Sequence, residues 1–448
     1  MEKESRNPSR KVLLVLPPPK EGFRYFKIKC PPLGLLSIAT YLKQNLPGTD
    51  IKILDGEVTD ERYIYETVRS WGADIVGMGA HLLNYENCLS LGRIAKEKGS
   101  SVFIGGHHAT LIWDRILRNR DFVDGIVKGD GEKAFLEIVQ GKPFGEIKNL
   151  AYREGGRIIE NRRVNLDLDT LPSPDYGIID DLNLYVNHDL RKKRLFDIYA
   201  QKGCLWREKT GGCLFCSRQD IGYRTRNPET VWKEIADLGQ TYSADLVWEI
   251  SDSFTSDRRY LNEFCRHKPH LETPPLRIYS RSTDIDRKVA GMLREMNVAE
   301  VTIGMESGDR GCLERIGKGT TPESNIEAVK ILNDFGIEVI PNIVFGHPGE
   351  TKDSMKRTIS HLEQIAAIGN VFTVSLHIMH PYPCSKMFEM MMQIPELRKK
   401  YALTDVFDLE ELDKEWINNF CKVSYEQVRE YAKSVDFFKY PIIAGMKL

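Results

Sequence analysis

The sequence predicts an α/β protein: an N-terminal Rossmann-like, doubly wound domain followed by a partial (β/α)6 TIM-like barrel and a helical C-terminal tail. Short apolar runs alternate with amphipathic helical stretches along most of the chain, which is typical of parallel sheets covered by helices. The 448 residues suffice for more than one hydrophobic core. Polar residues gather where the apolar runs end, as at the ligand-binding edge of such sheets.

The first predicted domain covers residues 8–150 and contains five apolar runs that predict strands. These runs lie at residues 11–17, 50–57, 73–80, 101–108 and 124–130. Ligands of doubly wound sheets bind beyond the carboxyl ends of the strands, where this chain carries many glycines. Glycine lets a large ligand approach the backbone, but it also serves tight turns, and both interpretations stay open.

The predicted connection to the next domain covers residues 151–195. Its first part, residues 151–164, predicts a β-hairpin that turns at Gly155 and Gly156. The rest contains two prolines and several acidic residues, as linkers do.

The partial barrel is predicted over residues 196–390 from six further apolar runs. They lie at residues 195–203, 245–252, 275–282, 300–307, 336–346 and 371–381. Two of the intervening helices begin with a capping residue and a proline, at Asn227 and at Thr321. Each run ends on residues suited to a site: Cys204, Asp252, Arg281, Glu306 with Ser307, Gly346 with His347, and His380. The carboxyl edge of a barrel holds its active site, so we expect one shared site.

Three of the nine cysteines stand close together as C-x8-C-x2-C, at Cys204, Cys213 and Cys216. A structural zinc site normally takes four ligands, and mixed ligands near Cys265 are one possible completion. A thioredoxin-like C-x-x-C is another interpretation. Three thiolates also suit a [4Fe–4S] cluster that leaves one iron open for a substrate or cofactor.

The stretch GCLWREKTGGCLFCSR resembles the cluster loop of radical S-adenosylmethionine (radical SAM) enzymes, although the first two cysteines are five residues further apart than usual. Three later stretches are similar to motifs of the same family: VTIGMESGDRGCLERIGKGTTPE, VIPNIVFGHPGET and HPYPCSKMFE. In the last of these, Cys384 replaces a usual glycine. In the first domain, PPLGLLSIATYL, GGHHAT and GIVKGDGEKAF resemble the cobalamin (B12)-binding domain of one radical SAM subgroup.

The resemblance implies a [4Fe–4S] cluster on Cys204, Cys213 and Cys216, with SAM on the fourth iron. The residues that it assigns to SAM are Phe215, Asp252, Arg281, Gly304, Glu306, Ser307, Gly346 and Pro348. An N-cap role for Asp252 is an equally open alternative. Arg281 suits the SAM carboxylate because a guanidinium binds that group bidentately.

The resemblance also implies cobalamin as a third cofactor. The residues that it assigns to cobalamin are Pro18, Leu33, Gly34, Gly79, Gly105, Gly106, His107, His108, Gly129, Gly131 and Glu132. The D-x-H-x-x-G motif that supplies a histidine to cobalt in mutases is absent from the sequence. His107 and His108 are therefore expected either to line the loop beneath the corrin or, for one of them, to approach the cobalt.

The implied function is a cobalamin-dependent radical SAM enzyme, foremost a methyltransferase that acts on an unactivated carbon, or phosphorus, of a small molecule or peptide. It would use a 5′-deoxyadenosyl radical and methylcobalamin, with an electron donor such as flavodoxin or ferredoxin. Cyclisation, ring rearrangement or oxidation without methyl transfer is the alternative. A non-catalytic B12 or nucleotide sensor is another class, to be favoured if SAM binds without being cleaved. Cys384, after the sixth strand, is a candidate substrate contact.

Composition narrows the partners and the compartment. The net charge of −1 and the lack of a basic C-terminal domain argue against a nucleic-acid partner. No apolar run spans a membrane and no secretory signal is evident, so we expect a cytoplasmic protein without a membrane partner. Residues 391–448 predict helices that either cap the open side of the barrel or simply pack against it.

Overall fold

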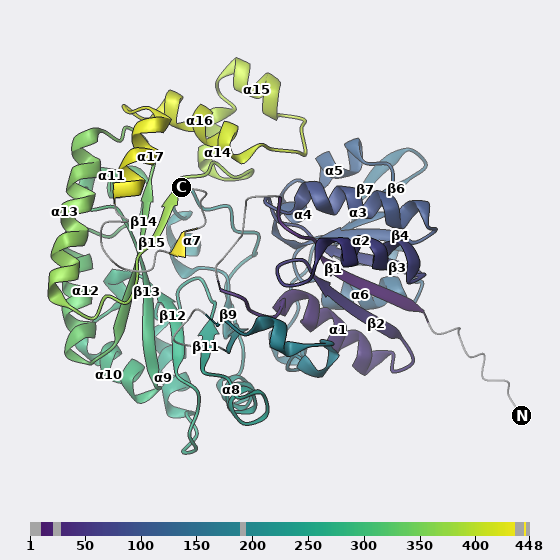
Figure 1. The fold of residues 1–448 in the computed structure, drawn as a ribbon, viewed down its shortest axis with the longest axis horizontal. Coiled ribbons are helices and arrows are strands. Elements are labelled where there is room, and N and C mark those ends of the chain that lie inside the picture. Colours follow the sequence, from purple (N-terminus) through teal and green to yellow (C-terminus); the bar gives the residue numbers. More distant parts are fainter. Residues whose placement is uncertain (1–9, 21–27, 189–193, 435–442, 445–448) are drawn as a thin grey trace, which may run out of the picture. The chain divides into compact units, whose positions relative to one another are not determined.

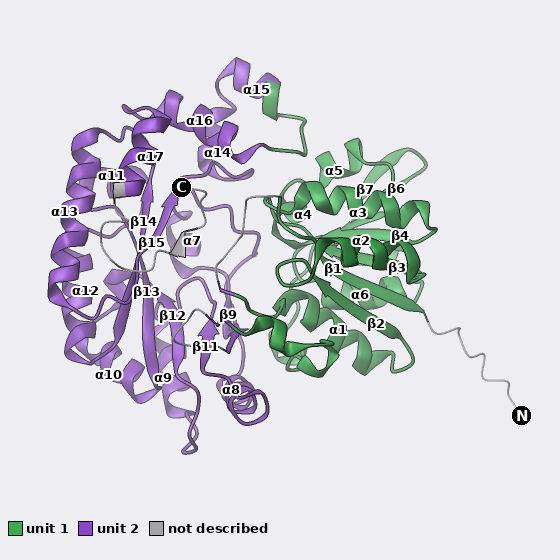
Figure 2. Cartoon of the chain, in the orientation of Figure 1, with its two compact units in different colours: residues 1–25, 29–186, 400–407 green, residues 26–28, 187–399, 408–448 purple. Residues whose placement is uncertain are grey.

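The structure is a computed structural model that describes residues 10–20, 28–188, 194–434 and 443–444 (Figure 1). The chain divides into two compact units (Figure 2). The first comprises residues 1–25, 29–186 and 400–407, and the second comprises residues 26–28, 187–399 and 408–448. The predicted domain start at residue 8 lies outside the described residues. Within the described part of the chain, no helix has the length and apolar character needed to cross a membrane.

The first unit is built on a seven-stranded sheet with the order β2-β1-β3-β4-β5-β6-β7. Its strands are β1 (Lys11–Leu16), β2 (Asp50–Asp55), β3 (Ile75–Gly79), β4 (Ser101–Gly105), β5 (Gly125–Val127), β6 (Leu150–Glu154) and β7 (Arg157–Glu160). The five predicted strands pair in parallel, which confirms the doubly wound domain. The strand order reverses between β1 and β3, where such sheets open a crevice for ligands.

Helices cover both faces of this sheet. They are α1 (Leu33–Asn45), α2 (Glu61–Ser70), α3 (Tyr85–Glu97), α4 (Gly106–Leu111), α5 (Trp113–Asn119) and α6 (Glu132–Val139). On one face, α1 and α6 bury Leu42 and Phe135 in the main core with β1 residues such as Leu14. The strand predicted over residues 101–108 ends at Gly105, because Gly106 takes a φ of 87° and the chain turns into α4.

The predicted hairpin is confirmed, and it belongs to the first sheet. Strands β6 and β7 pair antiparallel across a turn at Gly155 and Gly156, whose φ angles are 55° and 78°. Strand β6 also pairs with β5, so its backbone hydrogen bonds tie the hairpin to the sheet. The first unit therefore continues to residue 186, past the predicted domain end at residue 150, and regains residues 400–407.

The second unit is an open half-barrel with the strand order β16-β15-β14-β13-β12-β11-β8, all parallel. Its strands are β8 (Leu195–Ile198), β11 (Leu246–Glu249), β12 (Leu276–Ser280), β13 (Val298–Glu306), β14 (Glu338–Phe345), β15 (Ser375–Ile378) and β16 (Ile443–Ala444). The six predicted strands are confirmed. The C-terminal β16 was not predicted, and β9 (Gln201–Lys202) pairs separately with β10 (Arg224–Thr225).

Helices follow the strands of the half-barrel and extend into the tail. They are α7 (Leu205–Thr210), α8 (Pro228–Tyr242), α9 (Arg258–Arg266), α10 (Arg287–Glu295), α11 (Arg310–Arg315), α12 (Pro322–Asp334), α13 (Lys352–Ile368), α14 (Lys386–Met391), α15 (Pro395–Tyr401), α16 (Leu409–Phe420) and α17 (Tyr425–Ser434). Both predicted caps are confirmed, since Asn227 accepts a hydrogen bond from the Glu229 amide and Thr321 forms a capping box. Residues 391–448 are helical where the structure describes them, apart from connecting loops and β16.

Candidate active site

The loop that carries the three cysteines begins at the end of β9. Gly203 stands there with a φ of 90°, and a Cβ atom on it would lie 2.0 Å from the Gly222 carbonyl oxygen. Only glycine fits this close backbone approach. Cys204 is the N-cap residue of α7, so six of the eight residues in the C-x8-C spacing form a short helix. The enlarged spacing is therefore an ordered insertion within the loop.

The far end of the loop is anchored on the segment that follows α11. The Leu214 amide donates to the Ile316 carbonyl at 2.9 Å, and the Trp206 indole N–H donates to the Gly317 carbonyl at 3.1 Å. The Cys216 amide donates to the Cys213 carbonyl at 3.1 Å, which closes the C-x2-C turn. Both anchors hold the loop at a defined place on the half-barrel.

The three thiols are half-buried, and none forms a disulfide. Within the described residues, no three His, Cys, Asp or Glu side chains lie close enough to hold a single metal ion. A [4Fe–4S] cluster binds its thiolates on different irons, so it needs thiols that stand apart around a larger volume. The donor set fits a cluster of this kind.

A buried ion pair lies beside the loop at the end of β13. Lys318 Nζ is 2.6 Å from Glu306 Oε1, and both side chains are buried. Glu306 Oε2 is buried without a hydrogen-bond partner, so the carboxylate has room for one more donor. A Cβ atom on Gly304 would lie 2.6 Å from both Glu306 Oε1 and Lys318 Nζ. A side chain at residue 304 would disturb the pair.

Arg281 joins this charged group from the end of β12. It donates to the Lys318 carbonyl, and its guanidinium lies 4.2 Å from the centre of the Trp206 ring in α7. Burial raises the pKa of the Cys213 thiol, while the charges of Lys318 and Arg281 oppose that rise. The site thus places positive charge where a thiolate is needed.

Asp252 lies after β11 and pairs with Arg218, two residues beyond Cys216. Asp252 Oδ1 is 2.7 Å from the Arg218 guanidinium, whereas Oδ2 is buried without a partner. Burial raises the pKa of the Asp252 carboxyl, and the Arg218 charge opposes it. The alternative role of helix cap is wrong for Asp252, because Asp257 caps α9 by accepting from the Arg259 and Tyr260 amides.

Most of the remaining residues that were predicted to contact SAM form hydrogen bonds within the protein. Ser307 is fully buried, and its hydroxyl lies 2.9 Å from Thr358 Oγ1. Gly346 has a φ of 96°, and its carbonyl accepts a 2.8 Å hydrogen bond from the indole of Trp416 in α16. Pro348 is half-buried, and its carbonyl accepts from Arg315. Phe215 is half-buried within the cysteine loop.

The segment after β15 brings Cys384 to the cysteine loop. Cys384 is exposed and has a φ of 65°. Two and three residues further on, Lys386 Nζ lies 3.5 Å from the Gly212 carbonyl and the Met387 amide donates to Leu214 at 3.3 Å. The candidate substrate contact therefore stands next to the cluster loop.

Several residues of this edge were missed by the sequence reasoning. Lys318 stands in the quoted stretch IGKGTT, so its motif was visible although its pairing with Glu306 was not. Asp413 of α16 was also missed, and its Oδ1 lies 2.7 Å from Nδ1 of the predicted edge residue His380. Glu249 ends β11 almost fully buried, and burial raises its pKa to about 7. Nothing in the local sequence distinguishes Asp413 or Glu249 from other acidic residues.

In the first unit, the predicted cobalamin residues gather at the carboxyl edge of the sheet. Pro18 follows β1 and packs on Gly56, where a Cβ atom would lie 2.2 Å from the Pro18 nitrogen. Gly79 ends β3 and Gly105 ends β4. A Cβ atom on Gly106 would lie 2.8 Å from the Ala80 carbonyl, so this turn requires glycine in addition to its positive φ.

The neighbouring turn and helix ends complete this edge. The Gly129 amide donates to Thr110 at 3.1 Å, and Gly131 caps α6. Glu132, the first residue of α6, is buried and accepts from Ser37 of α1 at 2.8 Å, while its Oε2 has no hydrogen-bond partner. Leu33 and Gly34 open α1, and the space around the Gly34 α-carbon is free of other atoms. Glu132 Oε2 is thus a buried acceptor whose hydrogen-bonding capacity is not used within the protein.

The two adjacent histidines have different environments. His108 is buried edge-to-face against Tyr85, with ring centres 4.8 Å apart, and its Nε2 lies 3.5 Å from the Asp405 carbonyl oxygen. Burial lowers the pKa of His108 to about 4, so it is neutral at physiological pH. His107 is half-buried at the start of α4. The packing of His108 favours a structural role over cobalt ligation.

Comparison with known proteins gives two domain matches. A model of the B12 binding domain matches residues 23–139, and one of the radical SAM superfamily matches residues 198–362. The chain is 27% identical over 435 residues to an uncharacterized methyltransferase of Pyrococcus horikoshii, covering 93% of this chain and 91% of the relative. It is 25% identical over 453 residues to the anaerobic magnesium-protoporphyrin IX monomethyl ester cyclase of Rubrivivax gelatinosus, covering 96% and 79%.

A solved structure with a similar fold is that of the cobalamin-dependent S-adenosylmethionine radical enzyme OxsB with aqua-cobalamin and S-adenosylmethionine bound. The TM-score is 0.67 at 18% sequence identity. The match covers 87% of this chain but only 62% of OxsB. This likeness supports the order of the two domains and the half-barrel fold.

Proposed function

Because the chain belongs to the radical SAM superfamily and carries a B12-binding domain ahead of the radical SAM domain, we propose that it is a cobalamin-dependent methyltransferase. The acceptor is an unactivated carbon, or phosphorus, of a small molecule or peptide. The cofactors of these domains are a [4Fe–4S] cluster, SAM and cobalamin. The cluster supplies the electron that cleaves SAM, and cobalamin carries the methyl group.

One observation carries the choice of methyl transfer. The relative named as a methyltransferase aligns over 93% of this chain and 91% of its own length, whereas the Rubrivivax gelatinosus cyclase is covered over 79% of its length. A match limited to the radical SAM domain would support SAM cleavage alone. The similarity over the whole length supports a reaction that uses both units.

The cysteine loop and the charged group beside it have distinct tasks in this proposal. Cys204, Cys213 and Cys216 hold three irons of the cluster. Glu306 Oε2 accepts a hydrogen bond from the SAM amine, while Oε1 stays paired with Lys318. Arg281 retains guanidinium N–H groups for the SAM carboxylate after its bond to the Lys318 carbonyl.

The surroundings of the other predicted SAM contacts support a different role for each residue. Asp252 Oδ2 lacks a partner and is available to SAM or substrate. Gly346 and Pro348 shape the adenine pocket through their backbone, and Phe215 flanks the adenine. Ser307 supports the Glu306 turn, since its hydroxyl is already shared with Thr358. The residues with these assigned roles are the first to substitute.

The cobalamin site in this proposal lies at the carboxyl edge of the first sheet. Gly105, Gly106 and Gly129 form the turns of this edge, where the Cβ positions of Gly106 and Gly129 face Ala80 and Arg163 of the protein itself. The amide side chains of a corrin are hydrogen-bond donors, and Glu132 Oε2 is a buried acceptor without a partner. The cofactor would thus satisfy a group that the protein leaves unpaired.

A cyclase-type reaction is the alternative candidate. The Rubrivivax gelatinosus cyclase aligns over 96% of this chain, a slightly larger share than the methyltransferase. Such an enzyme would use the same cofactors, but SAM would be consumed only by reductive cleavage. The two candidates therefore differ in one product, S-adenosylhomocysteine.

The deciding experiment measures the fate of SAM. The full chain is reconstituted anaerobically with iron, sulfide and hydroxocobalamin and then reduced, with flavodoxin or a chemical reductant, in the presence of CD3-labelled SAM. We expect about one S-adenosylhomocysteine per bound cobalt before any acceptor is added, together with slow formation of 5′-deoxyadenosine. Release of 5′-deoxyadenosine with no S-adenosylhomocysteine would exclude methyl transfer and favour the cyclase-type reaction.

The control is the triple variant Cys204→Ala, Cys213→Ala, Cys216→Ala. It should lose its iron and all 5′-deoxyadenosine while it retains cobalt. Acceptors are then sought by mass spectrometry of metabolite and peptide mixtures for products that carry the CD3 group.

A further inference from the structure

Eight residues of the C-terminal region belong to the first unit. Helices α14 and α16 on either side lie in the second unit, whereas residues Lys400–Phe407, here termed the strap, are part of the first (Figure 2). The sequence predicted only a helical tail for this region. The strap is held by side chains of α3, α4 and α5 and by Arg120, which follows α5.

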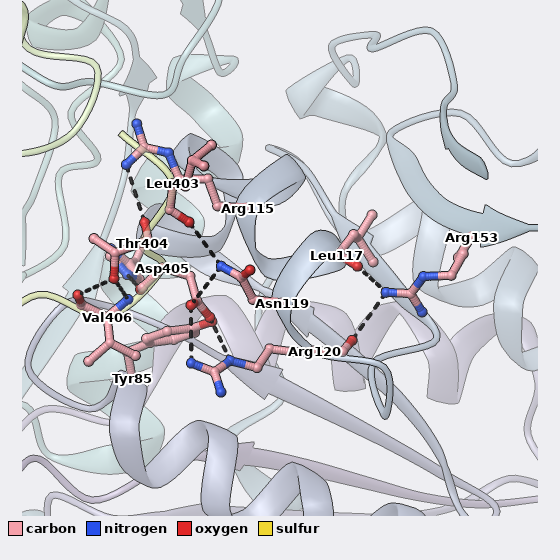
Figure 3. A network of polar contacts seen from close by, with 11 residues as sticks. Tyr85, Arg115, Leu117, Asn119, Arg120, Arg153, Leu403, Thr404, Asp405 and Val406 are labelled. Atoms are coloured by element: carbon pink, nitrogen blue, oxygen red, sulfur yellow. Dashed lines mark hydrogen bonds and ion pairs between the residues drawn. The ribbon is translucent and has the colours of Figure 1, made fainter. Parts of the chain in front are cut away.

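The strap is anchored by one buried carboxylate (Figure 3). Asp405 is 2% exposed and accepts hydrogen bonds from three side chains. Arg120 binds it bidentately, at 2.7 Å to Oδ2 and 3.1 Å to Oδ1. The Tyr85 hydroxyl donates to Oδ2 at 2.7 Å, and the Asn119 amide donates to Oδ1 at 3.1 Å. A carboxylate with every lone pair engaged is a specific anchor.

Arg115 and the same Asn119 side chain bind the strap's backbone. Arg115 donates to the carbonyls of Tyr401 and Thr404 at 3.0 Å and 3.3 Å, and Asn119 donates to the Leu403 carbonyl at 2.9 Å. The side chain of Leu403 is 74% exposed, so the strap is recognised through Asp405, its carbonyl groups and its flanking aromatic rings.

The strap reaches the predicted cobalamin edge through His108. The His108 ring lies between Tyr85 and Phe407, with ring centres 4.8 Å and 6.0 Å away. Its Nε2 faces the Asp405 carbonyl at 3.5 Å. His108 is the third residue of α4, which starts at Gly106 directly after β4. The position of the Gly106 turn therefore depends on a ring that the strap holds from behind.

We propose that Asp405 is a positioning residue for cobalamin, acting through Tyr85 and His108 to fix the Gly106–His108 turn on which the cofactor rests. The inference rests on the proposed use of cobalamin by the first unit. It predicts that a residue far along the chain from the B12-binding domain controls affinity for cobalamin. The strap contributes no direct contact to the cofactor in this account.

The test measures binding of hydroxocobalamin to the full chain by equilibrium dialysis. In Asp405→Asn the shape is kept, but the charge that Arg120 binds is lost and one side-chain oxygen becomes an N–H donor. We expect the dissociation constant to rise about tenfold, and more in Asp405→Ala. Iron content after reconstitution should stay at the wild-type level, because the cysteine loop belongs to the second unit.

A matched control separates positioning from general loss of stability. Asp124 lies in the same unit at the opposite, amino edge of the sheet, where it pairs with Lys96 at 2.7 Å and accepts from the Val102 amide. Asp124→Asn should lower the melting temperature of the unit without changing the affinity for hydroxocobalamin. Equal affinity losses in the two variants would overturn the proposal.

A double variant tests the route through His108. His108→Ala should also weaken hydroxocobalamin binding, and the loss in His108→Ala/Asp405→Asn should be smaller than the sum of the single losses, because both act on one turn. Additive losses, or wild-type affinity in Asp405→Asn, would overturn the inference while the proposed function stands. A wild-type chain that binds no hydroxocobalamin would overturn both.

Discussion

At the scale of single residues, the half-barrel edge is defined by buried carboxylates that are only partly satisfied. Glu306 uses one oxygen for Lys318, and Asp252 uses one for Arg218, while the second oxygen of each is buried without a partner. A buried polar atom without a hydrogen-bond partner destabilises the protein when the site is empty. A ligand that donates a hydrogen bond to this atom removes that destabilisation. These two oxygens are the first places to look for ligand contacts.

The Lys318→Met variant should lose SAM binding and SAM cleavage, while the cluster still forms. The substitution leaves the Glu306 charge buried without its partner, at a cost of about 3–5 kcal/mol of unfolding free energy. SAM binding and 5′-deoxyadenosine formation should fall at least tenfold, with iron content unchanged. Lys318→Arg, which keeps the charge, should recover part of the activity. Wild-type SAM affinity in Lys318→Met would contradict the role of the pair.

Glu249 should make the stability of the second unit depend on pH. Burial raises the folded-state pKa of Glu249 from the ordinary 4.5 to about 7. Hydrogen bonds from Ser251 and from the Ala200 amide oppose this rise, and Asp252 and Tyr223 lie nearby. The folded chain therefore holds the proton more tightly. The resulting stability is complete below about pH 4.5 and is lost as the pH rises through about 7.

The raised pKa of Glu249 contributes roughly 3 kcal/mol to the free energy of unfolding at low pH. In urea unfolding at several pH values, Glu249→Gln should show a flatter decline between about pH 4.5 and 7 than the wild-type chain. Glu327→Gln, at an exposed position of α12, should keep the wild-type profile. A wild-type slope in Glu249→Gln would assign the pH dependence to other groups.

At the scale of elements, the enlarged spacing of the cysteine loop contains a helix. Helix α7 fills the extra residues, and the glycines around it have separate tasks. A Cβ atom on Gly203 would strike the backbone of Gly222, whereas a Cβ atom on Gly211 would have only the mobile end of Lys386 nearby, at 3.5 Å. Glycine is thus required at residue 203 by the close backbone contact, whereas at residue 211 it is favoured only by the φ of 80°.

Gly203→Ala and Gly211→Ala form a matched pair for this loop. Gly203→Ala must displace the backbone that leads into Cys204, so reconstituted protein should hold less than half the wild-type iron. Gly211→Ala should cost about 1 kcal/mol and retain its iron. Iron and acid-labile sulfide per chain are the measurements. Equal iron in the two variants would show that the entry to Cys204 tolerates movement.

At the scale of the whole molecule, the chain crosses between its two units more than once. It leaves the first unit after residue 186, returns for the strap and leaves again after residue 407. Each unit nevertheless has its own sheet and its own candidate cofactor edge. Ligand binding should therefore act on the units separately.

Hydrogen–deuterium exchange of the full chain should reveal this division. Hydroxocobalamin should slow exchange in peptides that cover residues 105–108, 129–132 and 400–407, because the ligand stabilises the unit that binds it. Cluster reconstitution with SAM should slow exchange around residues 204–216 and 304–318. Protection by hydroxocobalamin at the cysteine loop but not at residues 105–108 would place its site elsewhere.

The sequence by itself determined the two α/β units, their parallel strands, the hairpin and the cysteine loop. Periodicity and capping act over a few residues, so short-range patterns such as the apolar runs and the Thr321 cap are legible without the fold. The family motifs also lie in single stretches. For the same reason, the order of the candidate edge residues along the chain was predictable.

Only the tertiary structure decided which of these groups meet. The pairing of Glu306 with Lys318 and the seventh strand β16 depend on contacts between separate elements. The strap is the clearest case, since Asp405 lies 285 residues from Arg120 along the chain. A carboxylate's partners are chosen by burial and three-dimensional approach, which no local pattern records.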